Sequence, residues 1–223
     1  MDPLPVDALI KVCHRLYDRG MVAATDGNVS IRLENGNILA TRSGINKGDV
    51  TERDLVEVTP KGEVAGAGKP STELKMHLYI YDQRPDVNAV VHAHPVVATA
   101  FAVARIPLDR LVLPEVVAGL GTIPLAHYAT PSTPEVSTSL RPFVKSNDAI
   151  LLANHGVVTA GSDVWDAYFK MEKVEHAARI ILLARMLGGE HALTPEEVRT
   201  LSAVSVQSYG KDLEQRLRDL GIL

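Results

Sequence analysis

Cysteine is nearly absent from this chain, because Cys13 is the single one among its 223 residues. One thiol cannot form an intramolecular disulfide, and it cannot supply the paired thiolates of a cysteine-based zinc site. A chain without disulfides fits a reducing compartment. An intramolecular disulfide and a cysteine-based zinc site are therefore both excluded.

Basic clusters, an uninterrupted apolar span and a signal sequence are also missing. The net charge is -4, and lysine and arginine are scattered, which gives no electrostatic basis for binding nucleic acid. The longest uncharged run, residues 87–104, is interrupted by Asn88, His92, His94 and Pro95, so a core strand and helix are favoured over a membrane span. The N-terminus has acid and proline where a signal peptide needs basic residues. We expect a cytoplasmic protein with no membrane or nucleic-acid partner.

The composition predicts one globular domain. A chain of this length with 46% hydrophobic and 22% charged residues can bury one sizeable core, and no repeat or long linker divides it. Residues 1–223 are therefore predicted to form a single domain. Helical and strand patterns are interspersed, and Asn-Gly between two short apolar strands indicates an antiparallel hairpin. These patterns predict a three-layer α/β/α fold with a mixed, largely antiparallel central sheet.

Caps, turns and periodicity place the individual elements. Helices are expected at 6–19, from 71 or 72 to near 84, from 95 to near 104, from 134 until Pro142 shortens it, at 163–187, and from 194 onward. Strands are expected at 29–33, 38–41, 55–59, around 64, 87–92, 122–126, 149–152 and 157–159.

Histidines stand at the ends of two of these apolar strands. His92 and His94 are two positions apart, so their side chains share one face of a strand. His155 follows another apolar run and precedes Gly156, which allows a close approach of backbone or ligand. Glu73 begins the helix upstream of the pair. If the fold brings them together, three imidazoles and a carboxylate form a ligand set for a divalent transition metal, most simply zinc.

Each of these residues also has a purely structural interpretation. A carboxylate in the first turn of a helix, such as Glu73, is stabilised by the helix dipole. His77 lies one helical turn after Glu73 and is a competing ligand candidate, for which we favour a packing or supporting role. Two histidines on one face favour the metal interpretation, because buried imidazoles need partners.

Three short turns rich in glycine and hydroxyl groups are candidates for anion binding. They read T-D-G-N-V-S at 25–30, T-R-S-G at 41–44 and K-P-S-T-E at 69–73. Turn chemistry alone explains each of them. Together, their N–H and O–H donors and a helix N-terminus could hold a phosphate. Nucleotide motifs are not supported, since no G-x-G-x-x-G follows a strand and Pro70 stands where a P-loop needs serine or threonine.

Five motifs in this order resemble those of the class II aldolase/adducin family, most closely the L-fuculose-1-phosphate aldolase type. They are G-N-V-S at 27–30, S-G-I at 43–45, P-S-T-E at 70–73, V-V-H-A-H-P at 90–95 and N-H-G at 154–156. The likeness extends over most of the chain, from residue 6 to residue 210. It implies a class II aldolase-like fold and a homotetramer of C4 symmetry with its sites between subunits.

The resemblance also implies a role for each site residue. His92, His94 and His155 would hold one Zn²⁺ per subunit, with Co²⁺ or Mn²⁺ as alternatives. Glu73 would be a ligand that can leave the metal and carry a proton to and from carbon. The metal would stabilise the enediolate formed when a ketose 1-phosphate is split into dihydroxyacetone phosphate and an aldehyde. Tyr209 matches a C-terminal tyrosine that closes over the site. The phosphate-binding positions are matched by Gly27, Asn28, Ser43, Gly44, Ser71 and Thr72.

One departure from the family pattern leaves the substrate open. The L-fuculose-1-phosphate aldolases supply a tyrosine from the neighbouring subunit as acid for the aldehyde oxygen, whereas this chain has L-V-L-P-E at 111–115. Either Glu115 or Tyr209 takes that role, or the aldehyde portion differs, so a 5-deoxypentulose or methylthioribulose 1-phosphate is an equal candidate. A sugar-phosphate epimerase, dehydratase or decarboxylase on the same scaffold remains an alternative. So does a non-enzymatic adducin-like interaction module, against which the intact ligand set argues.

Overall fold

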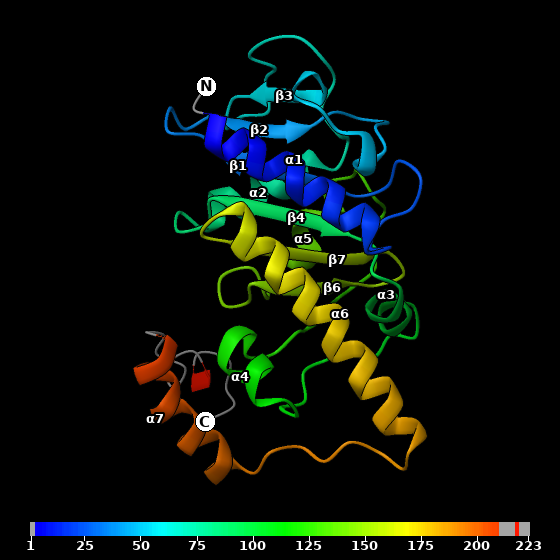
Figure 1. Ribbon diagram of the computed structural model, residues 1–223, viewed down its shortest axis with the longest axis vertical. Coiled ribbons are helices and arrows are strands. Elements are labelled where there is room, and N and C mark those ends of the chain that lie inside the picture. Colours follow the sequence, from blue (N-terminus) through cyan, green and yellow to red (C-terminus); the bar gives the residue numbers. More distant parts are fainter. Residues whose placement is uncertain (1–2, 210–216, 219–223) are drawn as a thin grey trace.

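A seven-stranded sheet lies at the centre of the molecule. The computed structural model describes residues 3–209 and 217–218, and its strands follow the order β3-β2-β1-β4-β7-β6-β5 (Figure 1). All neighbouring strands pair antiparallel except β5 and β6, which are parallel. The bounds are β1 Asn28–Arg32, β2 Ile38–Thr41, β3 Leu55–Val58, β4 Ala89–Ala93, β5 Leu125–Ala126, β6 Ala149–Leu152 and β7 Gly156–Gly161.

Helices cover both faces of this sheet. The bounds are α1 Pro3–Asp18, α2 Leu74–Gln83, α3 Val96–Val103, α4 Pro114–Leu120, α5 Glu135–Leu140, α6 Val164–Met186 and α7 Pro195–Tyr209, with short 3-10 helices η1 Lys47–Asp49 and η2 Glu52–Asp54. Val91 of β4 joins the core beneath α1, α3 and α6, whereas Val90 joins the second core beneath α2 and α5. Adjacent strand residues face opposite sides of a sheet. The predicted three-layer arrangement is confirmed (Figure 1).

Local sequence features account for several element boundaries. Gly20 adopts φ 66° two residues after the end of α1, and the N–H of Met21 bonds to the carbonyl of Leu16, so the helix ends close to the glycine, as predicted. The predicted hairpin forms, with Ser30 opposite Ala40 across β1 and β2. Thr194 and Glu197 exchange hydrogen bonds as a capping box at the start of α7.

Other elements differ from the predicted ones. The predicted strand at 122–126 is reduced to the two residues of β5, because only Leu125 and Ala126 pair with β6. Near residue 64 a single bridge between Val58 and Val64 replaces the predicted strand. Helix α4 was not predicted, although Pro114 begins it in the position where helices accept proline. Its glycine, Gly119, and its seven-residue length leave little helical pattern in the sequence.

A buried carboxylate fixes the helix that follows the histidine pair. Glu175 of α6 is 3% exposed, and its Oε2 accepts the N–H groups of Val97 and Ala98 at 3.1 and 2.9 Å. These N–H groups belong to the first turn of α3, where a helix has no internal partner for them. The arrangement holds the start of α3, and the chain leading into it from His94, against α6.

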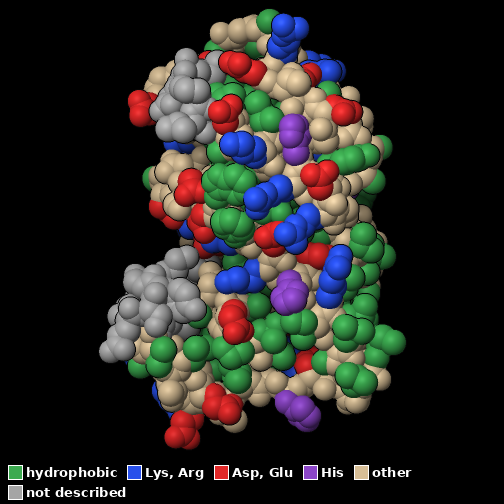
Figure 2. All heavy atoms as spheres, in the orientation of Figure 1, with side chains coloured by type: hydrophobic (Ala, Val, Ile, Leu, Met, Phe, Trp, Pro, Cys, Tyr) green, Lys and Arg blue, Asp and Glu red, His purple; other side chains and the backbone are tan. Residues whose placement is uncertain are grey.

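The outer face formed by α1 and α6 carries charge of both signs. Figure 2 shows lysine, arginine, aspartate and glutamate side chains interspersed over this face. Beneath it, Cys13 of α1 is fully buried, and burial raises the pKa of its thiol to about 12. Among the helices in the described part of the chain, none combines the length and apolarity needed to cross a membrane.

Candidate active site

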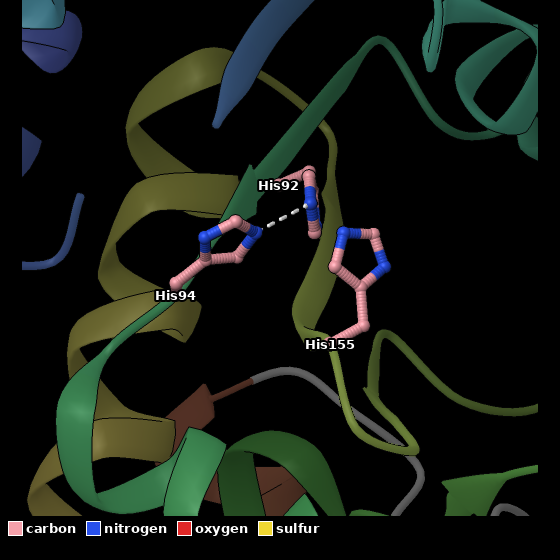
Figure 3. Close-up of side chains that lie close together, drawn as sticks. All are labelled: His92, His94 and His155. Atoms are coloured by element: carbon pink, nitrogen blue, oxygen red, sulfur yellow. Dashed lines mark hydrogen bonds between the residues drawn. The ribbon is translucent and has the colours of Figure 1, made fainter. Parts of the chain in front are cut away.

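Three imidazoles converge where β4 ends and β7 begins (Figure 3). His92 lies in β4, His94 follows it, and His155 precedes β7. The ring centroids are 4.7 to 5.2 Å apart, and each histidine offers a ring nitrogen within 4.8 Å of the others. The Nε2 atoms of His92 and His94 are 3.2 Å apart. The structure thus brings together the three histidines that the sequence singled out.

The register of β4 and β7 produces this convergence. Their antiparallel pairing sets His92 opposite Val158 and Ala93 opposite Val157, and the same register continued places His94 across from Gly156. A Cβ atom on Gly156 would lie 2.5 Å from Cδ2 of His94 and 2.6 Å from the carbonyl oxygen of Ala93. Glycine is therefore required here for the close approach of the two chain segments.

Glu73 completes the cluster from the other side. Its Oε1 lies 3.1 Å from Nε2 of His155, and its Oε2 lies 3.5 Å from Nε2 of His92. The side-chain N–H of Asn28 donates to Oε2 at 2.9 Å. Glu73 stands just before α2, and its own N–H donates to the hydroxyl of Ser71. The carboxylate is therefore held in reach of two imidazoles.

These donors fit a tetrahedral divalent ion. Two ligand atoms that are each about 2.0–2.1 Å from a zinc ion in tetrahedral geometry lie about 3.3–3.4 Å from each other. The separations of 3.2 Å between His92 and His94, and of 3.1 and 3.5 Å from Glu73 to His155 and His92, are close to this value. The donor set of three imidazole nitrogens and a carboxylate also suits zinc.

The electrostatics of the cluster favour the ligand forms of its side chains. Burial lowers the pKa of His92 to about 3, and burial also lowers the pKa of His94. Burial opposes ionisation of Glu73, but the hydrogen bond from His155 and the attraction of His92 and His155 outweigh it and hold its pKa well below the usual range. Nδ1 of His92 lies 2.9 Å from the carbonyl oxygen of Val157 and must donate to it. The lone pair of Nε2 then faces the cluster.

His77 lies outside this group and takes part in a separate buried network. Its Nδ1 is 2.7 Å from the hydroxyl of Ser30, which is also 2.8 Å from the hydroxyl of Tyr81. All three side chains are buried, so these bonds join α2 to β1. The contacts agree with the packing role favoured for His77.

The three turns predicted to bind an anion are linked to one another or to Glu73. The N–H of Ser43 donates to the carbonyl of Lys69 at 2.9 Å, and the N–H of Ser71 lies 3.3 Å from the carbonyl of Thr41, so the second and third turns are bonded together. Asn28 connects the first turn to Glu73 through its side chain.

The predicted phosphate-binding residues of these turns differ in exposure. Ser43, Gly44 and Thr72 are exposed, and Ser71 is half-buried, whereas Gly27 and Asn28 are buried. Gly27 has φ 72°, and a Cβ atom there would lie 2.9 Å from the carbonyl oxygen of His92. The first turn is thus packed directly on the strand that carries His92.

Two neighbours of the site are residues to which the sequence assigned no role. Oδ2 of Asp26 lies 3.6 Å from Nδ1 of His94, so this carboxylate can orient the imidazole ring. Ser132 has φ 67° and donates from its hydroxyl to the hydroxyl of Thr72 at 2.8 Å. Asp26 stood within a motif already singled out, whereas no pattern marks Ser132, which reaches the site through a long-range contact.

The two candidates for protonating the aldehyde oxygen lie away from the three histidines in sequence and in structure. Glu115 is exposed in the first turn of α4, and it lines a groove of about 770 Å³ together with Met21 and Glu175. Tyr209 is the last residue of α7, which lies at the end of the molecule opposite β3 (Figure 1). Its side chain is outside the described part of the structure, and its role stays a prediction.

Known proteins with similar sequences and structures match most of this chain. Residues 7–182 match the family model described as "Class II Aldolase and Adducin N-terminal domain". The chain is 38% identical over 172 residues to an L-fuculose phosphate aldolase of Methanococcus maripaludis, covering 77% of this chain and 92% of that protein. It is 33% identical over 182 residues to a 3-oxo-tetronate 4-phosphate decarboxylase of Escherichia coli, covering 79% and 85%. A solved L-fuculose 1-phosphate aldolase superposes with a TM-score of 0.83 at 31% identity, covering 92% and 97%.

Gly156→Ala should weaken metal binding by at least about tenfold, the range found when the supporting shell of a metal site is disturbed. The added methyl group would displace the ring of His94. Affinity for Zn²⁺ can be measured by competition with a chromogenic chelator. Gly66→Ala is the matched control, because nothing lies within 4 Å of a Cβ atom there. Equal affinities of the two variants would contradict the close-approach argument.

The metal-free protein should lose stability as the pH falls from 6.5 toward 4. Burial lowers the pKa of His77 from 6.5 to about 4 and that of His92 to about 3, so the unfolded chain takes up these protons at a higher pH than the folded chain. Their contribution is complete above pH 6.5 and declines below it. Urea unfolding in the presence of chelator measures the effect, and His77→Asn should flatten it. If the urea concentration at the unfolding midpoint does not change with pH over this range, the pKa values of the two histidines are not lowered in the folded chain.

Proposed function

The chain belongs to the class II aldolase/adducin family, and on this premise we propose that it is a metal-dependent lyase acting on a phosphorylated sugar. In the favoured reaction a ketose 1-phosphate, such as L-fuculose 1-phosphate or a 5-deoxypentulose or methylthioribulose 1-phosphate, is split reversibly into dihydroxyacetone phosphate and an aldehyde. The observation that carries the proposal is the convergence of three imidazoles and Glu73 beside three hydroxyl-rich turns. An adducin-like interaction module would not need these metal-ligand side chains.

The metal is proposed to be zinc, one per subunit, with Co²⁺ or Mn²⁺ as workable substitutes. His92, His94 and His155 would hold it, and Glu73 would be a further ligand in the resting state. When bound, the ion supplies a Lewis acid that polarises the substrate carbonyl.

Glu73 is suited to carry the proton between enzyme and carbon. In the cleavage direction the C3–C4 bond of the ketose breaks, its electron pair stays on C3, and Glu73 delivers a proton to that carbon. In the condensation direction Glu73 removes the same proton. Its depressed pKa keeps the carboxylate ionised at neutral pH, which is the form that removes the proton in condensation, and Asn28 orients it. In cleavage, Glu73 first takes up a proton from water and then delivers it to C3. The proton of the C4 hydroxyl goes to Tyr209 or Glu115.

The phosphate of the substrate is proposed to bind at the three turns. Backbone N–H groups and the hydroxyls of Ser43, Ser71 and Thr72 are donors suited to a dianion. A phosphate fixed there holds the reacting carbons at the metal side of the pocket, which lowers the entropic part of the barrier. The remaining positions of this proposed site are Gly27, Asn28 and Gly44.

Decarboxylation is a second candidate function. A 3-oxo-tetronate 4-phosphate carries a carboxylate on the carbon from which a ketose 1-phosphate loses its aldehyde. Loss of carbon dioxide leaves the electron pair on the same carbon, and protonation gives the same dihydroxyacetone phosphate. This reaction needs no acid for an aldehyde oxygen, which fits the absence of tyrosine from residues 111–115. The similarity to a protein named as a decarboxylase supports the same candidate.

The protein is proposed to act in the cytoplasm, because its single buried thiol needs no oxidising environment. It is also proposed to be a C4 homotetramer with sites between subunits. Helix α7 lies far from β4 and β7 in its own subunit, so Tyr209 would have to reach the site of a neighbour (Figure 1). Analytical ultracentrifugation should show a particle of four chains. A monomer at the concentration of the activity assay would contradict this arrangement.

The central test measures products from metal-loaded protein. Ketose 1-phosphates should release dihydroxyacetone phosphate and an aldehyde, whereas 3-oxo-tetronate 4-phosphate would release dihydroxyacetone phosphate and carbon dioxide, so the second product separates the two candidates. A chelator should abolish either activity, and zinc should restore it. Glu73→Gln should lower kcat by about 10²–10⁴-fold, the usual contribution of a positioned acid–base group.

Glu34→Gln is the matched control, since Glu34 is an exposed carboxylate in the hairpin turn. It should leave kcat unchanged. Full activity of Glu73→Gln, or undiminished turnover in the metal-free protein, would refute the proposed chemistry.

A further inference from the structure

Lys47 is a buried cation next to two of the anion-binding turns. Its residue is 1% exposed, which is rare for lysine unless its charge has partners. The ammonium group donates to the carbonyl oxygen of Thr25 at 3.1 Å and to that of Ile45 at 2.7 Å. Thr25 begins the first turn, and Ile45 directly follows the second turn. The side chain therefore joins the first turn to the second.

The surroundings of Lys47 hold its backbone in place. Lys47 begins η1, whose N-cap Asn46 accepts the N–H of Gly48 at 2.7 Å. Gly48 lies against the ring of Tyr17, because a Cβ atom there would be 2.6 Å from Cδ1 of that ring. The backbone next to Lys47 is thus packed against α1, while Thr25, Ser43 and Gly44 remain exposed.

The positive charge of Lys47 would attract an anion bound at these turns. An ammonium group in a weakly polar interior interacts strongly with nearby charge, because little water screens it. Burial lowers the pKa of the Lys47 ammonium, and the interactions with Cys13, Asp26 and Glu73 oppose that shift. The two backbone carbonyls accept hydrogen bonds from the ammonium but carry no net charge, so they do not cancel its attraction for a dianion.

We propose that Lys47 is a positioning residue for the phosphate half of the substrate: it holds the turns at 25–28 and 43–45 in register with each other and places a buried positive charge beside the bound dianion. This inference rests on the proposed phosphate site. Its consequence is a preference for phosphorylated over unphosphorylated ketones that does not depend on the metal ligands.

The test compares Lys47→Met with wild type, using the metal-loaded protein and inorganic phosphate as the probe. Isothermal titration should show phosphate affinity falling at least about tenfold in the variant, the scale of a lost charge-assisted interaction. KM for dihydroxyacetone phosphate in the condensation direction should rise by a similar factor with little change in kcat, and the affinity for Zn²⁺ should stay within a few-fold. Lys61→Met, which removes an exposed lysine, is the matched control and should change none of these.

Lys47→Gln separates the two parts of the effect and serves if Lys47→Met does not fold. Its amide can donate to both carbonyls but carries no charge, so it should fold and still bind phosphate more weakly than wild type. Unchanged phosphate affinity in either folded variant overturns the inference, as does a parallel loss of zinc affinity, which would mark a purely structural lysine. If wild type itself binds no phosphate, the proposed phosphate site fails first, and the role of Lys47 fails with it.

Discussion

The antiparallel register of β4 and β7 is the constraint on which the site depends. It sets the residue after β4 against the residue that begins β7, and only a glycine allows the two segments to approach that closely. His94 and His155 then face each other across the gap, and His92 faces them from within the strand. A shift of one residue in this pairing would turn His92 to the other face of the sheet and separate the three imidazoles. The convergence of the three imidazoles thus depends on the pairing of the two strands as much as on the histidine side chains.

The turn at 25–28 links the parts of the site. Thr25 receives the ammonium of Lys47, and Asp26 lies beside His94. Gly27 packs on the carbonyl of His92, and Asn28 donates to Glu73. These four successive residues therefore contact Lys47, two of the three histidines and Glu73. A single turn can in this way align the proposed phosphate site with the cluster of three histidines and Glu73.

Sequence patterns predicted most of this structure, and the failures have physical causes. The hairpin and the long helices followed from turn and capping residues, which act over a few positions. The three histidines and Glu73 could be grouped only by ligand type, and the pairing that unites them is long-range. Asp26 and Ser132 were missed because their contacts with His94 and Thr72 join distant segments. Helix α4 was missed because it is short and contains glycine, so tertiary contacts with α6 and α7 decide its conformation.

The isolation of Cys13 has a practical consequence. The thiol is completely covered in the core, and its raised pKa leaves almost no thiolate at neutral pH. Alkylating dyes and spin labels therefore have no native target in the folded chain. A cysteine introduced at any exposed position becomes the sole reactive handle, so fluorescence or paramagnetic probes can report on the movement of chosen segments without first removing the native sulfhydryl.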